Sequence, residues 1–282
     1  NGDCKMAITG GVNLFLLPSR FVQYSQMGFL SHKKYCSPFG EEADGTIFGE
    51  GIATVLLKPL KDAVRDKDNI YGVIKSTAIN SGGKTNGFTV PSPAAQSNLV
   101  YRALQSAKAD ARTISYYETH GTGTYLGDPI EIRGLTSAFE KNMKETGGWN
   151  GEPFCKIGSV KANIGHLESA AFMAGLIKVL LQMRYHKLVP SLHSEEANKR
   201  IPFEKSPFEL QHSNQMWNDN HVLRAGISSF GAGGSNACAI LEEYKQDKRE
   251  NSEEAYPVML SARNEKELKE KANKLLRHLQ DS

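Results

Sequence analysis

The sequence predicts an α/β fold, because strand-like runs alternate with glycine turns and helical patterns. Residues 114–119 form a strand-like run that ends at His120, and glycines then lead into a helix. Residues 155–183 repeat this order as a short strand, a glycine turn that carries His166, and a helix that is apolar on most sides. Such a helix is expected in a core. Strand ends that face helix starts are where open α/β sheets place their sites.

The other elements follow from local patterns, taken in chain order. Extended apolar runs predict a buried strand, a long strand with a bulge and a third strand, at residues 5–12, 44–57 and 71–79. Helical spacing predicts helices within residues 18–30, 60–68, 92–108, 128–139 and 167–183. Ser92 and Pro93 fit the N-cap and the first helical position of the third of these. A surface loop and a hairpin are expected at residues 141–153 and at strands 222–227 and 236–242.

Composition limits the function classes. The 282 residues are 39% hydrophobic and 23% charged, with a net charge of +3, which predicts a globular chain with a real core and gives no sign of nucleic-acid binding. The longest apolar run, residues 170–183, is interrupted by Lys178 and falls short of the roughly 20 residues that span a bilayer, so no membrane segment is expected. The cysteines lack CxxC spacing, which indicates neither zinc nor a disulfide framework and fits a reducing cytoplasm: Cys4, Cys36, Cys155 and Cys238.

One glycine-rich stretch is similar to the end of a phosphate-binding loop. Gly83, Lys84 and Thr85 match the last part of the GxxxxGK[ST] pattern, but its first glycine would fall at Ala78. Prolines at positions 91 and 93 follow, where the pattern requires a helix. We therefore predict a plain loop here and no nucleotide site.

Two histidines are the candidates for chemistry. His120 and His166 each follow a strand-like run and a glycine turn, and Lys161 and Glu168 lie close to the second histidine in sequence. Buried ionisable groups must be paired, hydrogen-bonded or shifted in pKa. A single histidine in such a place is more often structural, but two in matching settings favour a site.

Four longer motifs carry a family resemblance. They are ADGTIFGEG at residues 43–51, ETHGTGTYLGDPIE at 118–131, KANIGHLE at 161–168 and GISSFGAGGSNA at 226–237. In this order they resemble the ketosynthase (β-ketoacyl synthase) domains of modular polyketide synthases. The resemblance implies the thiolase-like, layered αβαβα condensing-enzyme fold, represented by the end of its first half and its complete second half. The Thr-Ala-Cys-Ser-Ser segment that supplies the family's nucleophile is absent from these 282 residues, so we expect a C-terminal portion of the domain.

The resemblance also implies catalytic roles. His120 and His166 would bind the malonyl thioester and stabilise its enolate. Lys161 would support His166, and Glu168 would pair with Lys161, which would let both charges survive burial. No metal and no permanently bound cofactor is implied.

Binding roles follow in the same way. Thr122 and Thr124 would hydrogen-bond the phosphopantetheine arm of an acyl carrier protein. The backbone N–H of Ala232, between Gly231 and Gly233, would supply half of an oxyanion hole. Many relatives carry a bulky aromatic residue where Ala232 stands, so the size of the acyl pocket stays open.

The resemblance divides the chain into three parts. Residues 1–244 correspond to the ketosynthase portion, 245–255 to a charged linker, and 256–282 to the start of a flanking subdomain with a strand and an amphipathic helix at 264–279. The expected partners are acyl carrier protein, the upstream half of the same ketosynthase and a second copy in a homodimer.

Three functions stay open at this point. The chain is part of an elongating ketosynthase, part of a condensing domain that only transfers or docks acyl chains, or a fragment inactive in isolation. The presence of both histidines favours elongation, because transacylation alone does not need enolate stabilisation.

Overall fold

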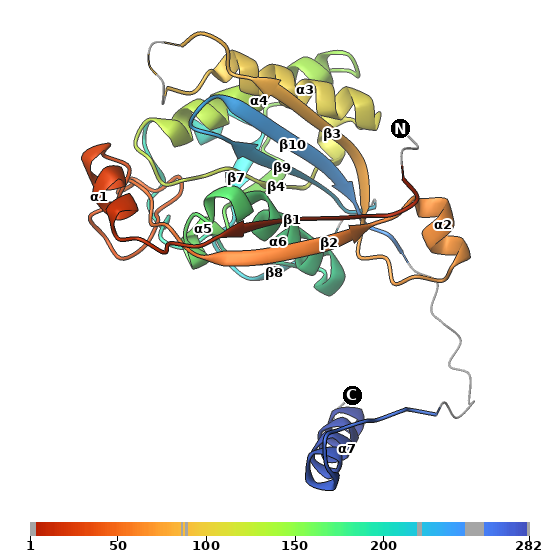
Figure 1. The fold of residues 1–282 in the computed structure, drawn as a ribbon. Coiled ribbons are helices and arrows are strands. Elements are labelled where there is room, and N and C mark those ends of the chain that lie inside the picture. Colours follow the sequence, from red (N-terminus) through yellow and green to blue (C-terminus); the bar gives the residue numbers. More distant parts are fainter. Residues whose placement is uncertain (1–3, 86, 88–89, 219–221, 246–256, 281–282) are drawn as a thin grey trace. The chain divides into compact units, whose positions relative to one another are not determined.

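A six-stranded mixed sheet forms the centre of the computed structural model (Figure 1). Its strands, in spatial order, are β3 (Val73–Ser81), β10 (Ser235–Glu242), β9 (Arg224–Phe230), β4 (Tyr116–Glu118), β5 (Cys155–Gly158) and β7 (Phe208–Leu210). β10 pairs antiparallel with β3 and β9, whereas β4 is parallel to both β9 and β5. The predicted hairpin is thus confirmed, and it lies beside the strand that leads to His120.

The structure describes residues 4–85, 87, 90–218, 222–245 and 257–280. The chain divides into two compact units, Asn1–Lys245 and Gln246–Ser282. All candidate site residues belong to the first unit. Residues 246–255 of the predicted linker lie outside the described part of the chain.

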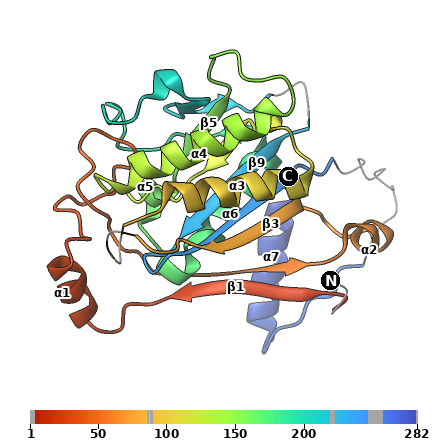
Figure 2. The same ribbon diagram turned by 90° about the horizontal axis from the view of Figure 1, so that it is seen from above.

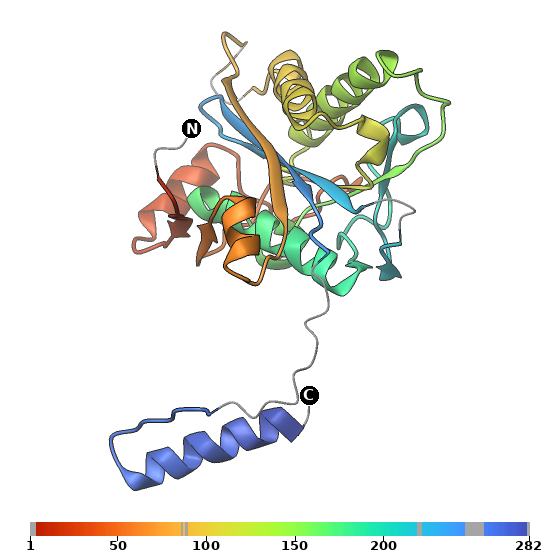
Figure 3. The ribbon, with the colours of Figure 1, turned by 90° about the vertical axis from the view of Figure 1, so that its right-hand side faces the viewer.

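Helices cover both faces of the central sheet. Helices α3 (Pro93–Ala107) and α4 (Gly127–Lys144) pack together on one face, and α6 (Ala171–Tyr185) lies on the other (Figure 3). An apolar core fills each side, with Leu99, Leu135 and Phe139 in the first and Leu176 and Val179 in the second. The central strand β4 is therefore buried along its whole length.

The N-cap prediction at Ser92 is confirmed, because its hydroxyl accepts a hydrogen bond from the N–H of Ala95 at 3.3 Å. Helix α4 runs to Lys144, so the predicted loop at 141–153 begins later than expected. The smaller elements are α1 (Ser19–Gln26), α2 (Leu60–Arg65), η1 (Ala111–Thr113), α5 (Lys161–Ile164), η2 (Glu168–Ala170), β6 (Lys187–Leu188), η3 (Phe203–Lys205) and β8 (Gln215–Met216).

The strand predicted to be buried at residues 5–12 is not buried. It forms β1 (Ala7–Asn13), which pairs antiparallel with β2 (Gly51–Leu57) in a separate two-stranded sheet (Figure 2). Ile8 is 78% exposed and Ile52 is 76% exposed. The prediction was wrong because apolar composition reports only that a strand can be covered, and no described element covers this surface.

Strand β2 is also shorter than the predicted strand at 44–57. Within the predicted range, residues 44–50 make only isolated bridges, from Thr46 to Leu30 and from Phe48 to His166. These bridges join the segment to two different parts of the unit, so it cannot lie in one continuous ladder.

The all-round burial expected for helix 167–183 is observed on one side only. The helix begins as a 3₁₀ turn, η2, and continues as α6, whose inner side packs on the sheet. On its outer side, Leu181 is 43% exposed and Tyr185 is 63% exposed. They line an open, apolar groove of about 630 Å³ together with Ile52 and Ile164.

The second unit contains helix α7 (Glu265–Gln280), close to the predicted amphipathic helix. The strand expected at its start is not observed over residues 257–262. A strand needs a neighbour to pair with, and the described residues of this unit provide none. Within the described residues, no helix is long and apolar enough to cross a membrane.

Candidate active site

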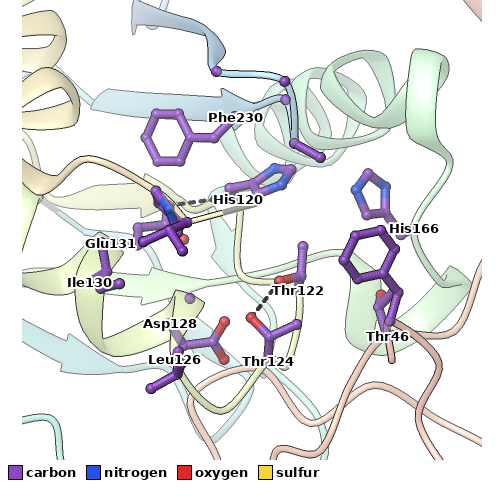
Figure 4. Close-up of a pocket in the computed structure, with 18 of the residues that line it drawn as sticks. Thr46, His120, Thr122, Thr124, Leu126, Asp128, Ile130, Glu131, His166 and Phe230 are labelled. Atoms are coloured by element: carbon purple, nitrogen blue, oxygen red, sulfur yellow. Dashed lines mark hydrogen bonds between the residues drawn. The ribbon is translucent and has the colours of Figure 1, made fainter. Parts of the chain in front are cut away.

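The two candidate histidines meet at one end of the central sheet. His120 directly follows the segment that leaves β4, and His166 lies between α5 and η2. Their ring centroids are 5.2 Å apart and their planes are 84° from parallel. Figure 4 shows both rings at the same cavity, although 45 residues separate them in sequence, from 120 to 166.

The backbone fixes the position of His166. Gly165 adopts φ +75° and ψ −177°, a conformation that is essentially restricted to glycine. The N–H of His166 donates to the carbonyl of Ile47 at 2.7 Å, and its own carbonyl accepts from the N–H of Gly49 at 3.1 Å. The segment before β2 therefore holds this histidine on both sides.

The same turn determines the tautomer of His166. Its Nδ1 accepts a hydrogen bond from the backbone N–H of Glu168 at 2.9 Å. A neutral imidazole that accepts at Nδ1 carries its proton on Nε2. His166 is thereby prepared to donate a hydrogen bond through Nε2.

A buried carboxylate anchors the turn that carries His120. Glu131 accepts hydrogen bonds from the backbone N–H groups of His120 at 2.7 Å and Gly121 at 2.8 Å. The ring of Phe230, at the end of β9, lies 5.7 Å from the His120 ring. Within the described residues, Nδ1 of His120 is buried and has no hydrogen-bond partner.

Burial and a nearby cation keep both rings neutral. Burial, and then the positive charge of Lys161, lower the pKa of His166 to about 3 and the pKa of His120 well below 6.5. Burial also lowers the pKa of Lys161, but the carboxylates of Glu118 and Glu131 oppose that change. At neutral pH both imidazoles are therefore uncharged, and each has one ring N–H that can donate a hydrogen bond.

Two acidic groups next to the histidine turn have the opposite shift. Burial raises the pKa of Asp128 to about 7 and that of Glu131 to about 7, even though backbone N–H groups favour their ionised forms. Asp128 accepts one of these bonds, at 2.7 Å, from Phe39. These two carboxyl groups hold the loop around His120, and both interact electrostatically with Lys161.

The predicted ion pair between Lys161 and Glu168 is not formed. The Glu168 carboxylate instead contacts Arg20 at 2.9 Å and accepts a hydrogen bond from the hydroxyl of Tyr24. Glu168 has φ +44°, so the chain turns sharply there and its side chain reaches α1. Tyr24 in turn stacks on Phe48 with ring centroids 4.4 Å apart. The sequence pattern missed Arg20 and Tyr24 because they lie more than 140 residues from Glu168.

The remaining predicted site residues line one cavity of about 990 Å³ together with the two histidines. Thr122 and Thr124 lie on its wall, with their hydroxyl oxygens 3.2 Å apart (Figure 4). The turn between β9 and β10 contributes Gly231, Ala232 and Gly233 to the same cavity. The structure thus brings together all the predicted binding residues.

Comparison with known proteins assigns the family. Residues 1–63 match the N-terminal domain of β-ketoacyl synthases, 71–195 match the C-terminal domain, and 197–282 match the ketoacyl-synthetase C-terminal extension. Polyketide synthase PksM of Bacillus subtilis is 50% identical over 98% of the chain, and polyketide synthase ThaG of Burkholderia thailandensis is 47% identical over 97%. This chain belongs to the β-ketoacyl synthase family.

Solved ketosynthases share its fold. The ketosynthase from module 6 of the bacillaene synthase of Bacillus subtilis 168 matches 99% of the chain with a TM-score of 0.88 and 38% identity. The oxazolomycin ketosynthase domain OzmH KS7 of Streptomyces albus matches 96% with a TM-score of 0.89 and 44% identity. The predicted thiolase-like fold is confirmed. The chain spans 48% and 47% of these two solved chains and only 6% of PksM and 5% of ThaG.

Proposed function

We propose that this chain supplies the enolate-stabilising half of an elongating polyketide ketosynthase. That enzyme would join an acyl thioester to a malonyl-type thioester on acyl carrier protein, with loss of carbon dioxide. The observation that carries the proposal is the pair of half-buried, neutral imidazoles with ring centroids 5.2 Å apart at the wall of one cavity. An enolate oxygen needs N–H donors already in place in a site that excludes water.

In this reaction the bond from the malonyl carboxylate to the α-carbon breaks, and its electron pair moves into an enolate. The enolate oxygen would accept hydrogen bonds from Nε2–H of His166 and a ring N–H of His120. The α-carbon then attacks the acyl thioester of a cysteine, and that cysteine leaves as a thiolate. The upstream half of the same ketosynthase would supply this cysteine. Because neither histidine has to change protonation state, their neutral form suits this role.

Lys161 would act on the rings through its charge. Its positive charge lowers the pKa of both histidines, which helps to keep them neutral. Thr122 and Thr124, on the wall of the same cavity, would hydrogen-bond the phosphopantetheine arm. The backbone N–H of Ala232 would bind the oxyanion of the condensation step. Acyl carrier protein and a second copy of the domain complete the proposed assembly, in the cytoplasm.

The test separates the two half-reactions. His166→Ala in the longest natural polypeptide that carries this chain should lower carbon dioxide release from malonyl carrier protein by about 10²–10³-fold. Acyl loading, followed by intact-protein mass spectrometry, should stay largely unchanged. His212→Ala, an exposed histidine outside the cavity, is the control. Equal loss of both steps would refute the proposal, and a wild-type protein that loads acyl groups without releasing carbon dioxide would show transacylation instead.

A further inference from the structure

A buried ion pair joins the central sheet to α6, and the mechanism above does not use it. Glu118, the last residue of β4, lies 2.9 Å from Nζ of Lys178 on α6. The two side chains are only 2% and 7% exposed. Removing two charges from water costs several kcal/mol for each ion, and their attraction offsets this cost only when the geometry is very good. A buried pair is therefore weak evidence for stability, and we looked for another role.

Glu118 connects both histidine segments. Its Oε1 accepts a hydrogen bond from the backbone N–H of Val160 at 2.6 Å, and its Oε2 accepts a hydrogen bond from the hydroxyl of Tyr116 at 2.8 Å. Val160 directly precedes α5, the turn that begins at Lys161 and leads to His166. Along the chain, Glu118 stands two residues before His120. The Glu118 carboxylate therefore fixes Val160, at the start of the segment that leads to His166, and Glu118 itself begins the segment that leads to His120.

The surrounding backbone is shaped for this pair. A Cβ added at Gly158 would lie 2.9 Å from the hydroxyl of Tyr116 and 3.4 Å from Nζ of Lys178. A Cβ added at Gly175, one turn before Lys178 on α6, would lie 3.1 Å from the side chain of Glu118. Both strand β5 and helix α6 thus carry a glycine where the buried charges need room.

The charge of Lys178 also affects the interaction between the Glu118 carboxylate and Lys161. Among the groups that favour the protonated form of Lys161, the Glu118 carboxylate has the largest effect. Without Lys178, that carboxylate would be an unbalanced buried charge, and Lys161 would be the remaining buried cation near it. If the Glu118 carboxylate turned toward Lys161, it would no longer accept the hydrogen bond from Val160. Lys161 would then move away from the imidazoles.

We propose that Lys178 is a positioning residue for the ketosynthase reaction, because it holds Glu118 on Val160 and so fixes Lys161 and His166 beside His120. The inference rests on the proposed function, but it makes a separate statement about geometry. It concerns no contact between Lys178 and substrate.

The experiment uses the longest natural polypeptide that carries this chain. Lys178→Met should lower kcat for decarboxylation of malonyl carrier protein by about 10–100-fold with KM changed by less than about 2-fold, since a displaced donor affects the transition state more than binding. Hydrogen exchange of the segment that contains the Val160 amide should become faster. Lys156→Met is the matched control, because Lys156 is an ion-paired lysine on β5 whose side chain is 26% exposed.

A double variant keeps the test decisive if Lys178→Met folds poorly. Lys178→Met with Glu118→Gln removes both charges of this ion pair together, and the glutamine oxygen can still accept from Val160. It should recover slow exchange at Val160 and at least about 10-fold of the lost kcat. Unchanged kcat and exchange in Lys178→Met, or a double variant as slow as the single one, would overturn the proposal. Absence of decarboxylation in the wild type would refute the proposed function, whereas the exchange measurement would still decide the positioning claim.

Discussion

Substitution of Gly165 by alanine should disable His166 through the backbone alone. Gly165 has φ +75°, and an added Cβ would lie 2.8 Å from the carbonyl oxygen of Ile47 and 3.2 Å from the nitrogen of Gly49. These are the two groups that hydrogen-bond the backbone of His166. The alanine would therefore strain its own backbone and push residues 47–49 away from His166.

The expected cost can be worked from these contacts. A non-glycine residue in this conformation costs about 1–3 kcal/mol. The two hydrogen bonds of His166 contribute about 0.5–1.5 kcal/mol each. We expect Gly165→Ala to lower the free energy of unfolding by about 2–6 kcal/mol in total, and a shift of the ring by about 1 Å to lower the decarboxylation rate by about 10²-fold.

Gly148→Ala is the matched control, since Gly148 has φ +84° but no atom within 4 Å of an added Cβ. It should cost about 1–2 kcal/mol and leave decarboxylation unchanged. Urea unfolding and carbon dioxide release would be measured for both variants. The reasoning is refuted if the two alanines have the same effect on stability and on rate.

Three further predictions concern protonation and pairing. Because the pKa of His166 is lowered to about 3, carbon-13 NMR of labelled histidine should show no titration of this ring near pH 6.5, and a midpoint near 6.5 would contradict this. The neutral ring's contribution to the free energy of unfolding is fully present above pH 6.5. It should fall by about 1.4 kcal/mol per pH unit as the pH falls from 6.5 toward 3. Arg20→Met should change the free energy of unfolding by less than about 1 kcal/mol, because its pair with Glu168 is partly exposed, and a larger loss in urea unfolding would show that the pair is structural. Burial raises the pKa of Cys238 to about 12 and that of Cys155 well above 9.0, so native-state alkylation of both thiols should be slow at pH 8, and rapid labelling before unfolding would count against their burial.

Local patterns were sufficient to predict the elements that carry the site. The order of strand, glycine turn and helix predicted the settings of His120 and His166, because strands that are parallel in one sheet bring their ends to one edge. Ser92 predicted the start of α3 because an N-cap is a local interaction. These predictions depend only on short stretches of chain.

Pairings across the chain could not be predicted in this way. The family resemblance implied a pair between Glu168 and Lys161, but the partners of Glu168 come from α1, which only the folded chain brings near. The exposure of β1 was missed because periodicity does not report what covers a strand. Lys178 did give a signal, as the charged residue that interrupts the apolar run 170–183, but nothing local identified Glu118 as its partner.

The central claim is that His120 and His166 together donate hydrogen bonds to the enolate of a malonyl thioester. The most direct measurement is a crystal structure of the natural polypeptide with a malonyl-pantetheine analogue that cannot lose carbon dioxide. We predict its thioester carbonyl oxygen within about 2.7–3.2 Å of Nε2 of His166 and of a ring nitrogen of His120. An analogue bound in the cavity with that oxygen outside hydrogen-bonding distance of both imidazoles would contradict the account.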